Sequence, residues 1–293
     1  LQARAIWKRR GEENLKRAVE LYQGAIARDA GFARAHAALA SAYVVLPGYS
    51  MEDVDQEKFL QMAEQSARQA LALDPNIGEA HAVLAQINAD KGNLLDDESG
   101  FFFAISLEPN EPTPHHWYSI LLNKVGRLDA GLEQARRAYE LDPSSPVLAS
   151  NLANTYLLRG EDEQALRYSK LARELGISSG ASEGVEATVA MRRGQWEEAK
   201  RLLAAQVTLP DELRPRVGQF VDAVADPAKR PAVVAGFRSI DPKVATQEDL
   251  LMPYLQMQQY DLVYRIVGES LDHDRTAWVH DWHLMHAGTT EGA

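Results

Sequence analysis

Two groups of residues have types and spacings that could support chemistry. The G-x-S-x-G pattern at 176–180 places Ser178 where α/β-hydrolases carry their nucleophilic serine. Near the carboxyl end, His280, His283 and His286 could offer three imidazole ligands to a metal ion such as Zn²⁺. Whether either group is a site depends on the elements that hold these side chains.

The context of Ser178 argues against a nucleophile. A catalytic serine of this pattern lies between a strand and a helix of a parallel-sheet fold, with a histidine base later in the chain. Here the apolar residues on both sides of the pattern recur at helical spacing, so 176–180 connects two helices. We expect no hydrolase chemistry at Ser178.

The histidine group is also poorly arranged for a metal. On a helix His280 and His283 are neighbours, but His286 lies about 240° around the axis from His280. Trp278 and Trp282 are interleaved with the histidines and favour a packed terminal helix. We expect no metal and no cofactor, and keep a metal site at these histidines as an alternative.

Other chemical signatures are missing from the sequence. It contains no P-loop, no G-x-G-x-x-G after a strand, no H-E-x-x-H and no cysteine, so disulfides, redox pairs and zinc knuckles are excluded. We expect that the protein is not an enzyme.

The elements are set by a repeat. Pro75, Pro109 and Pro143 are spaced 34 residues apart, and glycines at 92, 126, 160 and 194 keep the same spacing. This is the period of the tetratricopeptide repeat (TPR), a helix–turn–helix unit whose second helix ends at a proline. The chain thus resembles TPR proteins in its motif positions, with small residues where helices approach closely and large ones between them.

The repeat predicts an all-α fold, a right-handed TPR-type α-solenoid of antiparallel helix pairs with about six recognisable repeats. We expect a TPR array over 1–210, with an insertion at 44–62 in the second repeat. Residues 211–293 are expected to form degenerate helical repeats and a terminal capping helix, continuous with the array.

Two local features carry further expectations. His36, His81 and His115 all occupy position 4 of their repeats, which favours a packing role with hydrogen bonds between helices over metal binding. The opening segment is basic around Trp7 and is expected to be a solvated capping helix, or a segment close to an anionic surface.

The chain resembles one bacterial subfamily more closely. Trp7 with Arg9 and Arg10 ahead of the first repeat, the long second-repeat insertion and the His-His-Trp-Tyr run at 115–118 are similar to TPR regions fused to CadC/ToxR-like winged-helix transmembrane regulators, or to class III adenylate cyclases. The regulator resemblance implies a periplasmic location, which we favour slightly, and the cyclase resemblance a cytoplasmic one.

Charge and hydropathy narrow the partners. The net charge of −11 argues against a nucleic-acid backbone as partner in this segment. Acidic runs at 52–57 and 96–98 indicate a solvated surface or a preference for basic partners. The sequence has no run of about 18 apolar residues, so we expect no membrane span in this segment.

The working surface of such a solenoid is its concave groove, which positions 2, 5, 9, 12 and 13 of each first helix face. We expect a protein or peptide to bind there, with a basic partner as one option. The candidate residues are Glu79, Gln86, Asp90, His116, Asn123, Lys124, Asn154, Leu157, Leu158, Thr188, Met191 and Arg192.

The function expected from these observations is a non-catalytic protein-interaction or sensory domain of a bacterial signalling or transcription-regulating protein. The alternatives are a stand-alone assembly scaffold, or a small-ligand or metal sensor that uses the groove or the C-terminal histidines.

Overall fold

The computed structural model describes residues 2–49, 55–91, 94–177, 181–206, 209, 211–241, 251–263 and 265–266, and within these ranges all regular secondary structure is helical. The α-helices are α1 (Gln2–Lys8), α2 (Glu12–Arg28), α3 (Ala33–Val45), α4 (Gln56–Leu73), α5 (Gly78–Lys91), α6 (Leu94–Leu107), α7 (Pro112–Lys124), α8 (Leu128–Leu141), α9 (Pro146–Leu158), α10 (Asp162–Glu174), α11 (Ala181–Arg192), α12 (Trp196–Ala204), α13 (Val217–Ala225), α14 (Arg230–Arg238) and α15 (Leu251–Gln256). The 3₁₀ turns are η1 (Leu46–Tyr49), η2 (Arg214–Arg216) and η3 (Pro227–Lys229).

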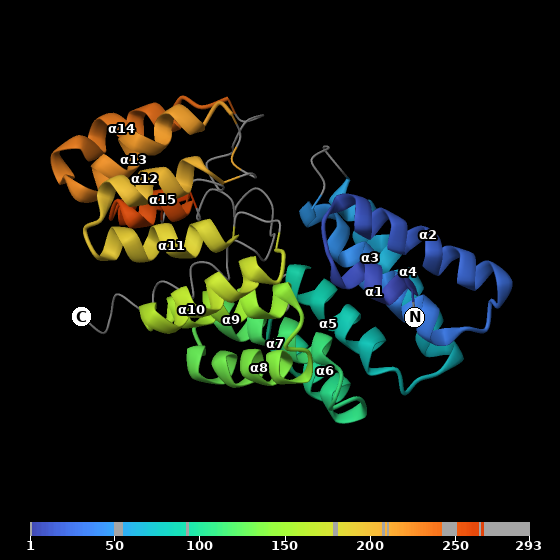
Figure 1. Ribbon diagram of the computed structural model, residues 1–293. Coiled ribbons are helices and arrows are strands. Elements are labelled where there is room, and N and C mark those ends of the chain that lie inside the picture. Colours follow the sequence, from blue (N-terminus) through green and yellow to red (C-terminus); the bar gives the residue numbers. More distant parts are fainter. Residues whose placement is uncertain are drawn as a thin grey trace.

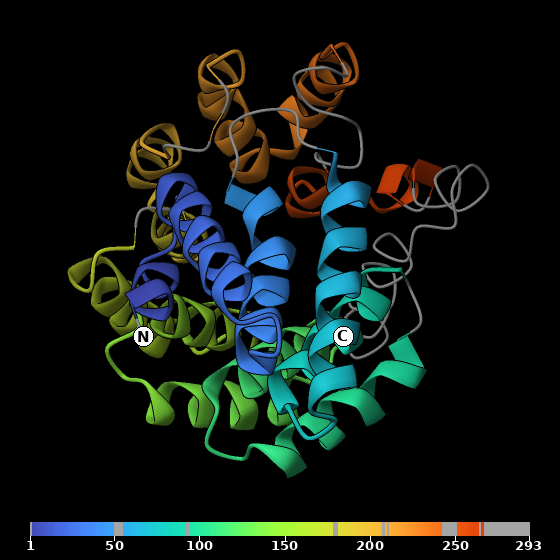
Figure 2. The same cartoon turned by 90° about the vertical axis from the view of Figure 1, so that its right-hand side faces the viewer.

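Consecutive helices form antiparallel pairs that stack into an arc. The blue α1–α4 and the orange α12–α14 lie at its two ends, with the green α5–α10 between them (Figure 1). From α3 to α13 each odd-numbered helix also packs on the next odd-numbered helix, so these helices form the inner layer. In Figure 2 the N-terminal helices face the viewer, with the green helices below and the orange helices above them.

Small residues let the helices approach at the repeat interval. Ala70, Ala104, Ala138 and Ala172 are spaced one repeat apart, and all four side chains are fully buried. An alanine at this position brings two helices close together, and larger side chains such as Phe101 fill the space beside it. The helical solenoid predicted from the 34-residue period is therefore confirmed.

The turns within the pairs depend on glycine. Gly126, Gly160 and Gly194 have φ angles of +74°, +75° and +69°, in the left-handed region that glycine enters without a steric penalty. Each glycine amide also donates to a carbonyl of the preceding helix, which ends two residues before the glycine. Gly92 of the same series lies outside the described residues.

The three position-4 histidines each make the same contact in their own repeat. Nε2 of His36, His81 and His115 lies 3.1, 2.9 and 3.2 Å from the carbonyl oxygen six residues earlier, at the turn between repeats. The packing role was therefore predicted correctly in part. The hydrogen bond fixes the turn before each helix, and His36 and His81 are only half-buried.

The predicted insertion at 44–62 is partly helical. Val45 ends α3, η1 follows directly, and α4 begins at Gln56, where the Asp55 carboxylate accepts a hydrogen bond from the Lys58 amide. The first two turns of α4 thus lie within the insertion. Residues 50–54, and the predicted terminal helix with its histidines, lie outside the described residues.

Candidate binding groove

The predicted groove residues lie on α5, α7, α9 and α11 of the inner layer, and they differ in exposure. The buried ones are Glu79, His116, Asn123, Leu157 and Met191. The half-buried ones are Gln86, Lys124 and Thr188, and the exposed ones are Asn154, Leu158 and Arg192. The side chain of Asp90 is outside the described residues.

The first half of this inner face is covered by α1. Nη1 of Arg4 donates to Glu79 of α5 over 2.7 Å, and Nη2 donates over 2.6 Å to Glu111, the residue that precedes α7. Nζ of Lys8 donates over 2.7 Å to Asp142, which follows α8. The basic opening segment is therefore no solvated cap, because its cations point inward at three carboxylates.

Glu79 is the buried centre of these contacts. Its side chain is 8% exposed, and its second oxygen accepts a hydrogen bond from Ser41 of α3 over 2.9 Å. Burial by itself lowers the pKa of Arg4, but Glu79 and Glu111 outweigh this effect and raise that pKa above its ordinary value. A predicted groove residue thus binds a helix of its own chain.

The end of α1 buries the side chain of Trp7 and, two residues after the helix, that of Arg10. The Arg10 guanidinium is stacked 3.6 Å above the Trp7 ring, and both side chains are buried. Within the described part of the chain, Nη1 of Arg10 and Nε1 of Trp7 have no hydrogen-bond acceptor. Burial lowers the pKa of Arg10 to about 10. Each unsatisfied buried donor costs about 1–3 kcal/mol, so this docked arrangement of α1 carries a penalty.

A narrow cavity adjoins these two donors. Its volume is ≈ 20 Å³, and its walls include Arg10, Trp7, Thr113, His116 and Ser145. A space of this size holds about one water molecule. Side chains of α7 and α9 thus enclose the end of α1. These helices belong to the inner layer that a groove ligand is expected to contact.

His116 lines this cavity, and its pKa is strongly shifted. Burial, with a smaller effect of the nearby Arg10 charge, lowers its pKa to about 3. The neutral imidazole is therefore favoured in the folded protein, whereas an unfolded chain binds a proton near pH 6.5. Between these two pH values the unfolded state holds one more proton than the folded state. The contribution of His116 to the free energy of unfolding is therefore fully present above pH 6.5 and decreases as the pH falls below it.

We expect this difference to appear as a pH-dependent loss of stability. Between pH 7 and pH 5 the wild type should lose about 2 kcal/mol more than His116→Gln, because protonation of the unfolded histidine contributes at most about 1.4 kcal/mol per pH unit. Urea unfolding followed by circular dichroism at several pH values measures it. Parallel stability profiles for the two proteins would contradict the assignment.

The second half of the inner face is polar and partly open. Asn123 donates to Thr155 over 2.8 Å and Asn151 donates to Ser119 over 2.7 Å, so two amide–hydroxyl bonds link α7 to α9. The side-chain amide nitrogen of Asn123 is therefore already hydrogen-bonded within the chain. The Asn123 side chain also packs against Gly131, because a Cβ added to Gly131 would lie 2.2 Å from Oδ1 of Asn123.

The exposed groove residues follow on the same helices. Asn154 is exposed on α9, and Leu158, one turn later, is 39% exposed. Arg192 of α11 donates to Asp162 over 2.6 Å and to the Leu157 carbonyl over 3.1 Å. An amide, an apolar side chain and a partly paired cation therefore lie at this end of the predicted groove.

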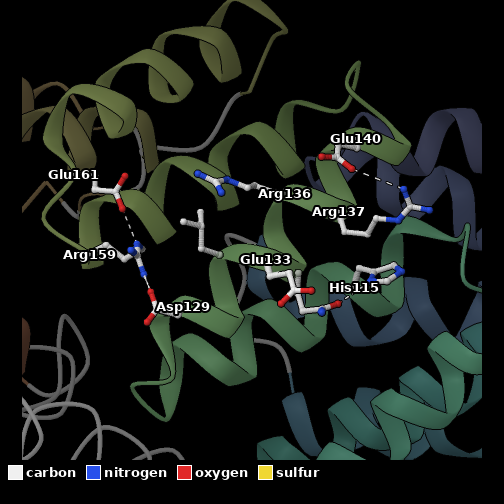
Figure 3. Close-up of a pocket in the computed structure, with 10 residues that line it drawn as sticks. His115, Asp129, Glu133, Arg136, Arg137, Glu140, Arg159 and Glu161 are labelled. Carbon is white, nitrogen blue, oxygen red and sulfur yellow. Dashed lines mark hydrogen bonds and ion pairs between the residues drawn. The ribbon is translucent and has the colours of Figure 1, made fainter.

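A wider hollow lies along α8. Its volume is ≈ 600 Å³, and its polar side chains largely bind one another (Figure 3). Arg159 pairs with Asp129 and Glu161 at one end, and His115 contacts Gln134 over 2.7 Å at the other. Most polar side chains of this hollow are therefore already paired within the chain.

Within the described residues, no three histidine or acidic side chains are grouped as metal ligands. No helix in that part of the chain is long and apolar enough to cross a membrane. Ser178, His280, His283 and His286 lie outside these residues.

Solved structures show the fold. The chain aligns with Pseudomonas aeruginosa PilF at 15% identity over 80% of this chain and 98% of that one, with a TM-score of 0.53. It aligns with the human IFIT1 dimer bound to m7Gppp-AAAA at 15% identity over 90% and 61%, with a TM-score of 0.57. The fold is a TPR-type α-solenoid.

A further solved structure aligns less well. YrrB, described as a TPR protein with an unusual peptide-binding site, aligns at 20% identity over 59% of this chain and 84% of its own, with a TM-score of 0.39. No protein-family model matches the sequence, and no curated protein matches it significantly.

The contacts of α1 with the TPR groove were missed from the sequence, although a signal exists. Arg4, Trp7 and Lys8 are spaced i, i+3 and i+4, which places two cations and an aromatic ring on one helix face. Glu108 and Asp142 precede prolines at the repeat interval, and the second of them receives Lys8. A basic helix face in a chain with acidic turns indicates an ion-paired contact between the two segments.

Proposed function

We propose that this TPR solenoid is a protein-interaction domain that binds a segment of another protein in its concave groove and does no chemistry of its own. The exposed pair Asn154 and Leu158 carries the proposal, because it offers a hydrogen-bonding amide and an apolar contact on the inner face of α9. Extended and helical peptides are both held by such combinations of polar and apolar contacts.

We also propose that the domain belongs to a bacterial signalling or transcription-regulating protein. The support is the sequence resemblance carried by Trp7, Arg9, Arg10 and the His-His-Trp-Tyr run. In such a protein, occupancy of the groove would be relayed to an output domain.

The groove is tested with a paired substitution. Asn154→Ala with Lys124→Ala removes one amide and one cation from the inner face, and we expect at least about tenfold weaker partner binding, the effect of losing about 1.4 kcal/mol. The measurement is a pull-down from bacterial extract with quantitative mass spectrometry, followed by titration of the enriched partner.

A matched control removes the same residue types elsewhere. Asn110→Ala with Lys170→Ala changes exposed side chains in the turn before α7 and on α10. A partner that is retained by wild type and control but lost from the groove variant supports the proposal. Equal retention by all three proteins would place the binding surface elsewhere.

A further inference from the structure

The inner face already holds a helix, and that helix indicates what kind of segment the face accepts. We propose that the groove over α5, α7 and the start of α9 binds a basic helix of a partner protein, with Arg, Trp and Lys at positions i, i+3 and i+4, and that α1 is its internal competitor. This inference rests on the proposed interaction function and names the chemistry of the partner.

Charge complementarity is the first argument. Glu79 lies near the start of α5, Glu111 in the turn before α7 and Asp142 in the turn after α8, and together these acids receive the two cations of α1. Glu108 adds a fourth carboxylate to this region. It accepts a hydrogen bond from the backbone N–H of Glu79 over 3.1 Å. Cations one turn apart on a single helix face reach acids that the solenoid spaces along its inner layer.

The second argument is that α1 occupies the face imperfectly. Its docking leaves Nη1 of the Arg10 guanidinium and the Trp7 indole N–H without acceptors within the described residues. Arg10 also has a φ angle of +56°, in a region that residues other than glycine rarely adopt. A partner helix can make the same ion pairs without turning back at such a residue, so it can displace α1.

The geometry of the link allows this exchange. Arg9, Arg10 and Gly11 join α1 to α2, and Gly11 has a φ angle of +79°. A segment of three residues with a glycine can change direction without disturbing α2, whose own core contacts include the fully buried Leu15 and Ala18. Release of α1 would uncover Glu79, Glu111 and Asp142 together.

The test uses the full chain and a labelled peptide of residues 2–11 as the probe. Arg4→Glu with Lys8→Glu should release α1, and fluorescence anisotropy should show the peptide binding this variant at least about tenfold more tightly than wild type, because a tethered competitor acts at an effective concentration near millimolar. Arg17→Glu with Lys16→Glu on α2 is the control and should behave as wild type.

A second design does not depend on charge reversal. Because the chain contains no cysteine, Lys8→Cys with Asp142→Cys can be joined selectively by a short bis-maleimide linker. The linked protein should lose peptide binding at least about tenfold relative to the same unlinked variant, in which α1 can leave. This comparison stays informative if the charge-reversed variant does not fold.

The outcomes separate this inference from the groove function. Peptide binding that is equal in wild type, released and linked proteins overturns the inference, and so does a wild-type dimer that exchanges α1 between copies. If a natural partner still depends on Asn154 and Lys124 while the peptide does not bind, the proposed function stands and only the basic-helix ligand is wrong. Binding that Glu79→Ala weakens in the released variant supports the assignment.

Discussion

Replacing Phe101 with alanine should destabilise the protein by about 3–5 kcal/mol, the largest effect we expect from a single substitution. The ring is fully buried in α6 and is stacked on Tyr118 of α7 with a centroid separation of 5.7 Å. Its loss would leave a cavity between adjacent repeats, where rigid helices cannot collapse to fill it. Urea unfolding monitored by circular dichroism measures the change.

The neighbouring residue supplies the control. Phe102 also contacts Tyr118, with centroids 5.2 Å apart, but is 55% exposed. Phe102→Ala should therefore cost no more than about 1.5 kcal/mol, the contribution of an aromatic pair. Equal losses for the two variants would mean that Phe101 is less well packed than the structure indicates.

The second large effect is expected at Glu79. Glu79→Ala removes the acceptor of both Arg4 and Ser41 and should cost about 2–3 kcal/mol, below the 3–5 kcal/mol typical of a broken buried pair, because the Arg4 side chain is 30% exposed. Chemical unfolding gives the energy. Hydrogen exchange of residues 2–8 should show, in addition, that α1 opens more often.

An exposed pair serves as the comparison for Glu79. The side chains of Arg17 and Glu20 on α2 are 60% and 62% exposed, and such surface pairs contribute little. Glu20→Ala should change stability by less than about 0.5 kcal/mol and leave the exchange of α1 unaltered. If Glu79→Ala has an equally small effect, α1 is held by packing and its ion pairs are incidental.

The solenoid was predictable because its causes are local and periodic. Prolines that end helices, glycines that accept a positive φ and alanines that allow close approach each act within one repeat, so a fixed interval reveals them. Gly126, Gly160 and Gly194 take the left-handed turns that this interval predicts.

The candidate groove was only partly predictable because its state depends on distant residues. Repeat positions place Glu79 and His116 on the inner face, but they do not predict that α1 covers both side chains. The same kind of position leaves Asn154 exposed but buries Asn123, whose amide donates a hydrogen bond to Thr155 of the next inner helix. A positional rule finds the face of a helix, whereas occupancy of that face is a property of the assembled array.

The contacts of α1 also change how the array should fold and unfold. A stack of repeats touches only near neighbours, so its segments can open with considerable independence. Arg4 and Lys8 instead bind residues 75, 107 and 134 positions away, across the third to fifth helix pairs. Such contacts close long loops and form late in folding, but once formed they make those pairs open together as one cooperative unit.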